Sequence, residues 1–198
     1  MPRYRLTLEY DGGPFVGWQR QDNGLSVLLA IEETVLAFCG ETVSLVAAGR
    51  TDAGVHATGQ VAHLDLVRET APERLQSAIN ALVRPHPVAV LQAARVSDGF
   101  NARFDAIARH YLYLILNRRA PSVLDRQRAW HVPHRLDAER MHAAAQALVG
   151  RHDFSSFRAA ECQSASPVKT LERIHVRRGG DRIEIAVKAR SFLHHQVR

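Results

Sequence analysis

The sequence predicts a chain that combines helices with strands, and three observations lead to this class. Residues 3–10 alternate apolar and polar side chains, which is typical of a strand with one face turned to water. Residues 26–40 repeat apolar side chains on one helical face, beginning with a serine suited to an N-cap and ending with a glycine suited to a stop. Two apolar runs, at 171–176 and 183–187, flank a turn with two glycines, which predicts a β-hairpin.

The remaining elements are expected between these. Apolar runs predict strands at 42–48, 61–66 and 108–117, the last of them buried, and helical patterns cover 72–82, with a proline in its first turn, and 136–150, which ends at a glycine. The order strand, helix, strand, strand partly recurs along the chain, which indicates a weak internal duplication. The chain is therefore expected to form two subdomains, residues 1–105 and 106–198.

Charge indicates the class of partner. Of the 198 residues, 26 are basic and 20 acidic, which gives a net charge of +6 and a pI near 10.0, and 46% are apolar, enough for a real core. Two of the basic residues are lysines, so 26 minus 2 leaves 24 arginines. The guanidinium fork binds phosphate and stacks on bases. We therefore expect a polyanionic partner, with nucleic acid as the first candidate.

Several classes of protein are excluded by residue type and spacing. Cys39 and Cys162 are too few for a disulfide framework, which favours a reducing, cytoplasmic location. No apolar run approaches the length needed to span a bilayer. Eleven histidines are present, but none has metal-ligand spacing, and no glycine-rich nucleotide-binding motif occurs. We expect no metal and no cofactor.

The segment 49–60 carries the strongest candidate for chemistry. It places Arg50 and Asp52 between Gly49 and Gly54, and it lies between two apolar runs, which predicts a tight loop between strands. A carboxylate beside a guanidinium stays ionised, and a positioned aspartate can act as a nucleophile or as a base. The plain alternative is that Asp-Ala-Gly is ordinary turn chemistry.

The run GRTDAGVHATGQV, which contains this loop, resembles the active-site signature of the TruA family of tRNA pseudouridine synthases. The resemblance implies that Asp52 is the catalytic residue and that Arg50 helps to extrude the target base. Tyr111, which follows Arg-x in the family pattern, would stack on the uracil. The final Ser-Phe-x-x-x-x-Val-Arg implies that Arg198 pairs with Asp52.

Other motifs extend the resemblance. The segment YDGGPFVGWQRQ, residues 10–21, resembles the N-terminal motif of the family, and Trp18 beside Gln19 and Arg20 is expected to offer RNA an apolar slab next to hydrogen-bond donors. Residues 152–170 resemble a further family block rich in hydroxyl, amide and basic groups, which suit phosphate and ribose contacts. Tyr113, on the same strand face as Tyr111, is expected to be core.

The resemblance implies an α+β fold in which two similar subdomains share an antiparallel β-sheet with helices on one face. It implies isomerisation of uridine to pseudouridine at positions 38, 39 and 40 of the tRNA anticodon stem-loop, without a cofactor, by a cytoplasmic homodimer. The family pattern continues through a further helix and strand beyond the last residue here, so the second subdomain is expected to be incomplete. Two alternatives stay open: a non-catalytic RNA-binding module, and a pseudouridine synthase that acts on another RNA.

Overall fold

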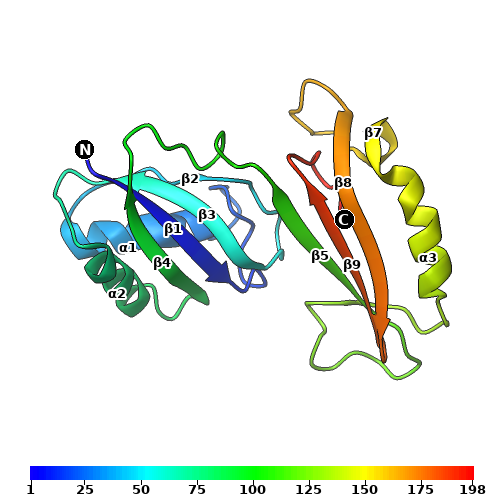
Figure 1. Cartoon of the computed structure of the whole chain (residues 1–198). Helices are drawn as coiled ribbons and strands as arrows, with labels where there is room; N and C mark the ends of the chain where they lie inside the picture. The colour runs from blue at the N-terminus through cyan, green and yellow to red at the C-terminus, as the bar shows by residue number, and fades with distance from the viewer. The chain divides into compact units, whose positions relative to one another are not determined.

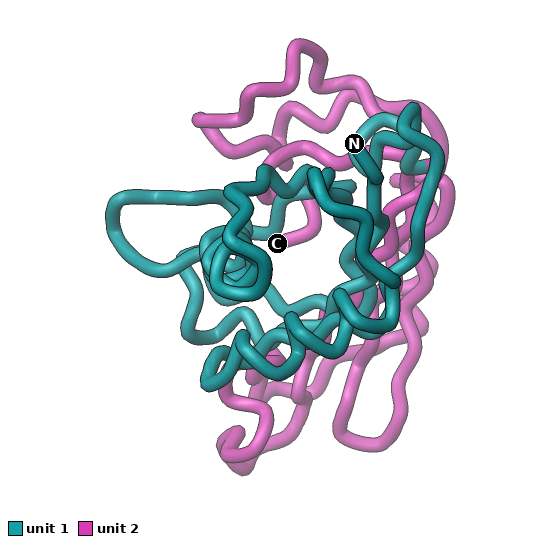
Figure 2. Tube along the Cα trace, turned by 90° about the vertical axis from the view of Figure 1, so that its left-hand side faces the viewer, with its two compact units in different colours: residues 1–106 teal, residues 107–198 magenta.

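The computed structural model describes all residues from 1 to 198 and divides into two compact units, residues 1–106 and 107–198 (Figures 1 and 2). Each unit contains its own β-sheet together with helix, which confirms the α+β class. The strands hydrogen-bond into two sheets, one in each unit, whereas the expectation was one sheet shared between the subdomains. No helix is long and apolar enough to cross a membrane.

Unit 1 is built on a four-stranded antiparallel sheet in the order β2-β3-β1-β4. Its strands are β1 (Arg3–Tyr10), β2 (Val46–Ala47), β3 (Ala57–Asp65) and β4 (Val88–Val96). The predicted alternation of β1 is observed, because Tyr4, Leu6 and Leu8 are all fully buried. The polar face of the strand is less covered, as the pattern requires.

Two helices cover one face of this sheet (Figure 1). Helix α1 (Val27–Cys39) begins at Ser26, whose hydroxyl accepts a hydrogen bond from the Leu29 amide at 3.1 Å, and it ends at Gly40 in the left-handed conformation. Helix α2 (Pro72–Leu82) has its proline in the first turn and buries Leu75 and Ile79. Both helices lie where the sequence predicts them.

The strands of unit 1 differ from the sequence prediction in two places. Of the expected strand 42–48, only Val46 and Ala47 form a strand, although the Ala48 amide also donates to the Val61 carbonyl. Val43 and Leu45 reach the core from irregular backbone. Strand β4 was not expected, since two prolines precede it and end the preceding helix. It nevertheless forms the long antiparallel edge of the sheet beside β1.

Unit 2 contains a five-stranded sheet in the order β6-β5-β9-β8-β7. Its strands are β5 (Arg109–Leu116), β6 (Trp130–His131), β7 (Gly150–Asp153), β8 (Val168–Gly179) and β9 (Arg182–Ala189). Only β5 and β6 pair in parallel. The predicted hairpin is confirmed as β8 and β9, which are joined by a two-residue turn whose Gly180 has a φ of 61°.

The other elements of unit 2 are shorter or more exposed than predicted. Helix α3 (Ala138–Ala145) continues only as a 3-10 turn (Gln146–Leu148), and Gly150 opens β7 with a φ of 109° rather than capping the helix. A second 3-10 turn covers Ser155–Phe157. Strand β5 is not a buried strand, because only its last two residues are buried and Leu112 is 58% exposed.

Candidate active site

The Asp52 loop connects β2 to β3, as the sequence predicts. Asp52 is half-buried and Arg50 is exposed. The amide of Val55 donates to the Asp52 carbonyl at 3.1 Å, which closes a turn, and Gly54 in this turn has a φ of 76° that other residues rarely adopt. Gly49, by contrast, does not take a positive φ. The structure forms no ion pair between Arg50 and Asp52.

The segment that follows β1 holds this loop in place. The amide of Trp18 donates to the Thr51 carbonyl at 2.9 Å, and the Tyr10 hydroxyl lies 2.8 Å from the Thr51 hydroxyl. At the start of the loop, the Gln60 side-chain amide donates to the Gly49 carbonyl at 2.6 Å. The residue before Asp52 is therefore fixed through both its backbone and its side chain.

Two glycines of the same segment allow the backbones to approach closely. A Cβ on Gly12 would lie 2.1 Å from the Val55 carbonyl oxygen, and a Cβ on Gly17 would lie 2.9 Å from that of Thr51. Gly17 also has a φ of 114°. No other residue fits these positions without moving the Asp52 loop. The sequence showed both glycines in one motif, but it could not show which backbone they contact.

His56 links the far side of the loop to the same segment. Its Nδ1 lies 3.1 Å from the Gly12 amide and 3.0 Å from a carboxylate oxygen of Asp11. One nitrogen serves one of these partners at a time, because it accepts from Gly12 when unprotonated and donates to Asp11 when protonated. Either state ties the end of the Asp52 loop to the residues that follow β1.

Trp18 does not have the role expected from its sequence context. Its side chain is 2% exposed, and its ring centroid lies 6.2 Å from that of Tyr10 in the core of unit 1, so the expected RNA-facing slab is wrong. Neighbouring Arg20 forms an ion pair with Glu32, a buried acid on α1 that also accepts from the Leu45 amide. This segment therefore acts through its backbone and its packing.

Tyr111 lies on β5 in unit 2, opposite Val187 of β9. It is half-buried, and the edge of its ring meets Phe192 with ring centroids 5.0 Å apart and planes at 88°. This geometry is a favourable aromatic contact that fixes the direction of the tyrosine ring. Tyr113 packs against the small core around Ile115, as predicted.

The C-terminal motif is anchored within unit 2. Leu193 is 4% exposed, its amide donates to the Gln196 side chain at 2.7 Å, and the Ala159 amide donates to the His194 carbonyl at 3.1 Å. Arg198 is exposed, and its amide donates to the His195 carbonyl.

The four predicted site residues are divided between the two units. One loop of unit 1 brings together Arg50 and Asp52, while Tyr111 and Arg198 belong to unit 2. The sequence analysis missed the residues that fix the Asp52 loop and the Tyr111 ring, which are Tyr10, Gly12, Gly17, Thr51, His56 and Phe192. All six lie in the segments quoted for the resemblance, which is the signal that could have indicated them.

The chain thus carries an aspartate loop held by glycine contacts on the antiparallel sheet of unit 1, and a half-buried tyrosine on β5 of unit 2. A sequence profile described as tRNA pseudouridine synthase matches residues 7–105 and 144–198. The chain is 60% identical over its whole length to tRNA pseudouridine synthase A of Parvibaculum lavamentivorans and covers 80% of that protein. The corresponding proteins of Xanthobacter autotrophicus and Beijerinckia indica are 59% and 63% identical, with 81% and 76% of their lengths covered.

The chain therefore belongs to the tRNA pseudouridine synthase family, whose members are isomerases. The profile covers the Asp52 loop, the segment that clamps it and the C-terminal motif.

Proposed function

We propose that this protein isomerises uridine to pseudouridine at positions 38, 39 and 40 of the tRNA anticodon stem-loop. The observation that carries the proposal is the Asp52 loop, whose sequence GRTDAGVHATGQV is held against the first motif by the Tyr10, Trp18 and Gly17 contacts. Identity of about 60% along the whole chain to tRNA pseudouridine synthase A supports it.

The reaction needs no cofactor, because its atoms and electrons balance within the nucleoside. The bond from the ribose C1′ to the uracil N1 breaks, the base turns, and C1′ bonds to C5. The proton lost from C5 is matched by one gained at N1. Because a stacked base is out of reach, the target must first be flipped from the RNA, at a cost of roughly a few kcal/mol.

Each site residue then has a role in this scheme. Asp52 either attacks the nucleoside or removes its proton, and Arg198 pairs with the Asp52 carboxylate. The exposed guanidinium of Arg50 fills the space that the flipped base leaves. Tyr111 stacks on the uracil, which retains the base while it is detached; such stacking contributes roughly 1 to 3 kcal/mol. The working protein is a cytoplasmic homodimer that binds tRNA.

The experiment compares wild-type protein with Asp52→Asn and Asp52→Ala on unmodified tRNA, with pseudouridine mapped by position. Both variants should bind tRNA and make no product, since neither the amide of asparagine nor the methyl group of alanine attacks or accepts a proton at the required rate. Thr58→Ser, in the same motif on an exposed position of β3, is the matched control and should retain activity. Undiminished product from either Asp52 variant would end the proposal. Pseudouridine found only outside positions 38 to 40 would show that the protein modifies a different site.

A further inference from the structure

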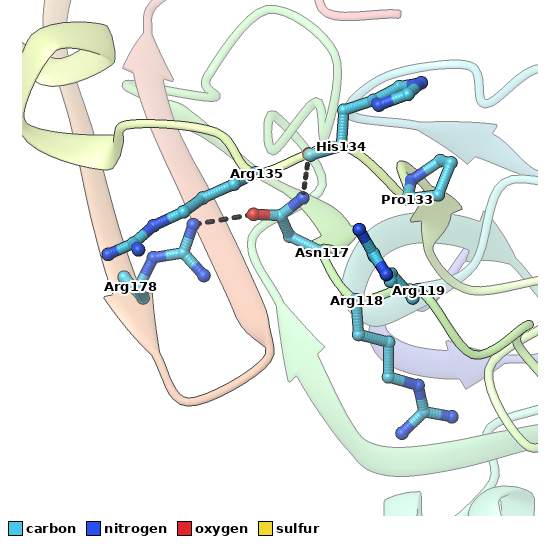
Figure 3. A pocket seen from close by; sticks show the side chains of 7 residues that line it. All are labelled: Asn117, Arg118, Arg119, Pro133, His134, Arg135 and Arg178. Atoms are coloured by element: carbon cyan, nitrogen blue, oxygen red, sulfur yellow. Dashed lines mark hydrogen bonds between the residues drawn. The ribbon is translucent and has the colours of Figure 1, made fainter.

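A basic cavity lies in unit 2 beyond the end of β5 (Figure 3). Its volume is about 470 Å³, within the roughly 300–1,000 Å³ typical of ligand pockets. Three segments contribute to it: the residues after β5, the turn between β6 and α3, and the end of β8. The side chains that determine its chemistry are Asn117, Arg118, Arg119, His134, Arg135 and Arg178.

Asn117 holds these three segments together. It is 7% exposed, and its amide nitrogen donates to the carbonyls of Val132 at 2.9 Å and His134 at 2.6 Å. Its oxygen accepts from the Leu136 amide at 3.1 Å and from the Arg178 guanidinium at 2.7 Å. All the hydrogen-bonding capacity of the side chain is used by the protein, so the frame of the cavity is set before any ligand arrives.

The cavity concentrates positive charge. Four arginines line it, and no acidic residue does. Arg118 lies 3.7 Å from the exposed carboxylate of Asp181, but Arg119 and Arg135 form no ion pair and no side-chain hydrogen bond. Guanidinium groups that share a cavity repel one another, and a ligand with several anionic oxygens would relieve that repulsion through paired hydrogen bonds.

We propose that this cavity binds phosphate groups of the RNA backbone, at a part of the substrate remote from the reacting uridine. The identity of that RNA as tRNA rests on the proposed function. Tyr111 lies on β5, and Asn117 follows the last residue of that strand, six residues further along the chain. At about 3.3 Å per residue, the two residues are roughly 20 Å apart. Because that separation spans several nucleotides, the phosphates in the cavity would lie several nucleotides away from the uracil held at Tyr111.

The test is the double variant Arg119→Ala/Arg135→Ala, measured with full-length tRNA and with a short oligonucleotide that ends within one or two nucleotides of the target uridine on each side. The full tRNA should bind about tenfold more weakly, and the plot of log affinity against log salt should lose a slope of about 0.9 for each phosphate contact removed. KM for full tRNA should rise while kcat at saturation stays unchanged. The oligonucleotide should bind both proteins equally, because it lacks the remote phosphates.

Arg140→Ala removes one exposed arginine from α3, where it forms no ion pair, and is the matched control for lost charge. It should leave the salt slope unchanged. Arg119→Lys/Arg135→Lys keeps both charges but removes the planar guanidinium groups. It should bind tRNA more tightly than the alanine double variant and more weakly than the wild-type protein. An unchanged affinity in the alanine double variant, or an equal loss for tRNA and oligonucleotide, would overturn the proposal.

Titration with inorganic phosphate in a calorimeter distinguishes the source of the phosphate. Saturable binding that the double variant abolishes, while tRNA affinity stays unchanged, would assign the cavity to a small phosphate compound and contradict the proposal. The proposed function is tested separately, by product formation. If the wild-type protein makes no pseudouridine but the double variant still loses the expected tRNA affinity, the proposed reaction is wrong and the phosphate site stands.

Discussion

Gly17 determines where the Asp52 loop can lie, although it is distant from Asp52 in sequence. The absence of a side chain lets its Cα approach the Thr51 carbonyl, and a Cβ there would also lie 3.2 Å from the carbonyl carbon of Asp52. Backbone contact with Gly17 therefore helps to position Asp52. Pattern recognition finds such a glycine, but only coordinates reveal its contact.

Gly17→Ala should lower kcat roughly 10- to 100-fold, because displacing a catalytic group by about 1 Å is enough for such a loss. It should also destabilise the fold by about 1–3 kcal/mol, since φ is 114°. Steady-state turnover of tRNA and urea unfolding measure the two effects. Gly59→Ala is the control, because no atom lies within 4 Å of its added Cβ. Equal turnover of the two variants would show that the Gly17 contact does not position Asp52.

Phe192 is expected to orient the Tyr111 ring, which it meets edge-on at 5.0 Å. Phe192→Ala should lower kcat with a smaller change in KM, while stability falls by the roughly 0.5–1.5 kcal/mol of the ring pair together with the loss of buried apolar area. Phe192→Tyr keeps the ring and should restore kcat. Turnover and thermal unfolding are measured for both variants. If stability falls but kcat is unchanged, Phe192 is a core residue that does not orient Tyr111.

At the scale of elements, His63 attaches the loop 97–105 to the sheet. Its Nδ1 accepts from the Ala102 amide at 3.1 Å, and its ring meets Phe100 edge-on. Burial lowers the pKa of His63 from its usual 6.5, and the nearby Arg3 guanidinium adds to this shift. The neutral ring is therefore the form that the folded protein prefers.

The sign of the pH dependence follows from this lowered pKa. The unfolded chain binds a proton near pH 6.5 and the folded chain only at lower pH, so the contribution to stability is complete above 6.5 and is lost as pH falls towards the folded pKa. Urea unfolding between pH 8 and pH 5 should show this loss. His63→Asn offers an acceptor to Ala102 without titrating and should flatten the curve. An unchanged curve in that variant would contradict the assignment.

A second group in the same sheet titrates in a different range. Arg3 donates to both carboxylate oxygens of Asp65 at 2.7 Å, and this hydrogen bonding lowers the pKa of Asp65 below 3.8. Its stabilising effect is present above that pH and is lost as the solution becomes more acidic. The losses from His63 and Asp65 therefore occur in separate pH windows, which lets one unfolding series read both.

Helices were easier to predict than strands because their signals are local. Ser26 and Gly40 mark both ends of α1, and Pro72 marks the start of α2. Strand β4 depends on pairing with β1, which is distant in sequence, and the prolines before it hide that partnership. Trp18 was also misjudged because its contacts are not local. Its polar sequence neighbours suggested a surface for RNA, whereas its ring packs against Tyr10 in the core.

At the scale of the whole molecule, the two units are supported by cores of different size. Unit 1 has one continuous cluster of 21 buried apolar residues. Unit 2 has two separate clusters of 6 and 4. Because buried apolar area is the main source of stability, these 198 residues are expected to contain a stable unit and a weaker one. Sequence alone did not show this, since apolar residues are frequent in both halves.

Hydrogen exchange followed by mass spectrometry should therefore find slower exchange in β1 and β3 than in β5, β8 and β9, although all five are paired strands. Leu6→Ala, at the centre of unit 1, should lose about 2–5 kcal/mol, whereas Ile183→Ala in the smaller cluster should open unit 2 without speeding exchange in β1. Tight tRNA binding should slow exchange in each unit that contacts the RNA, because a ligand stabilises the state it binds. Uniform exchange across all five strands would mean that the two units unfold together.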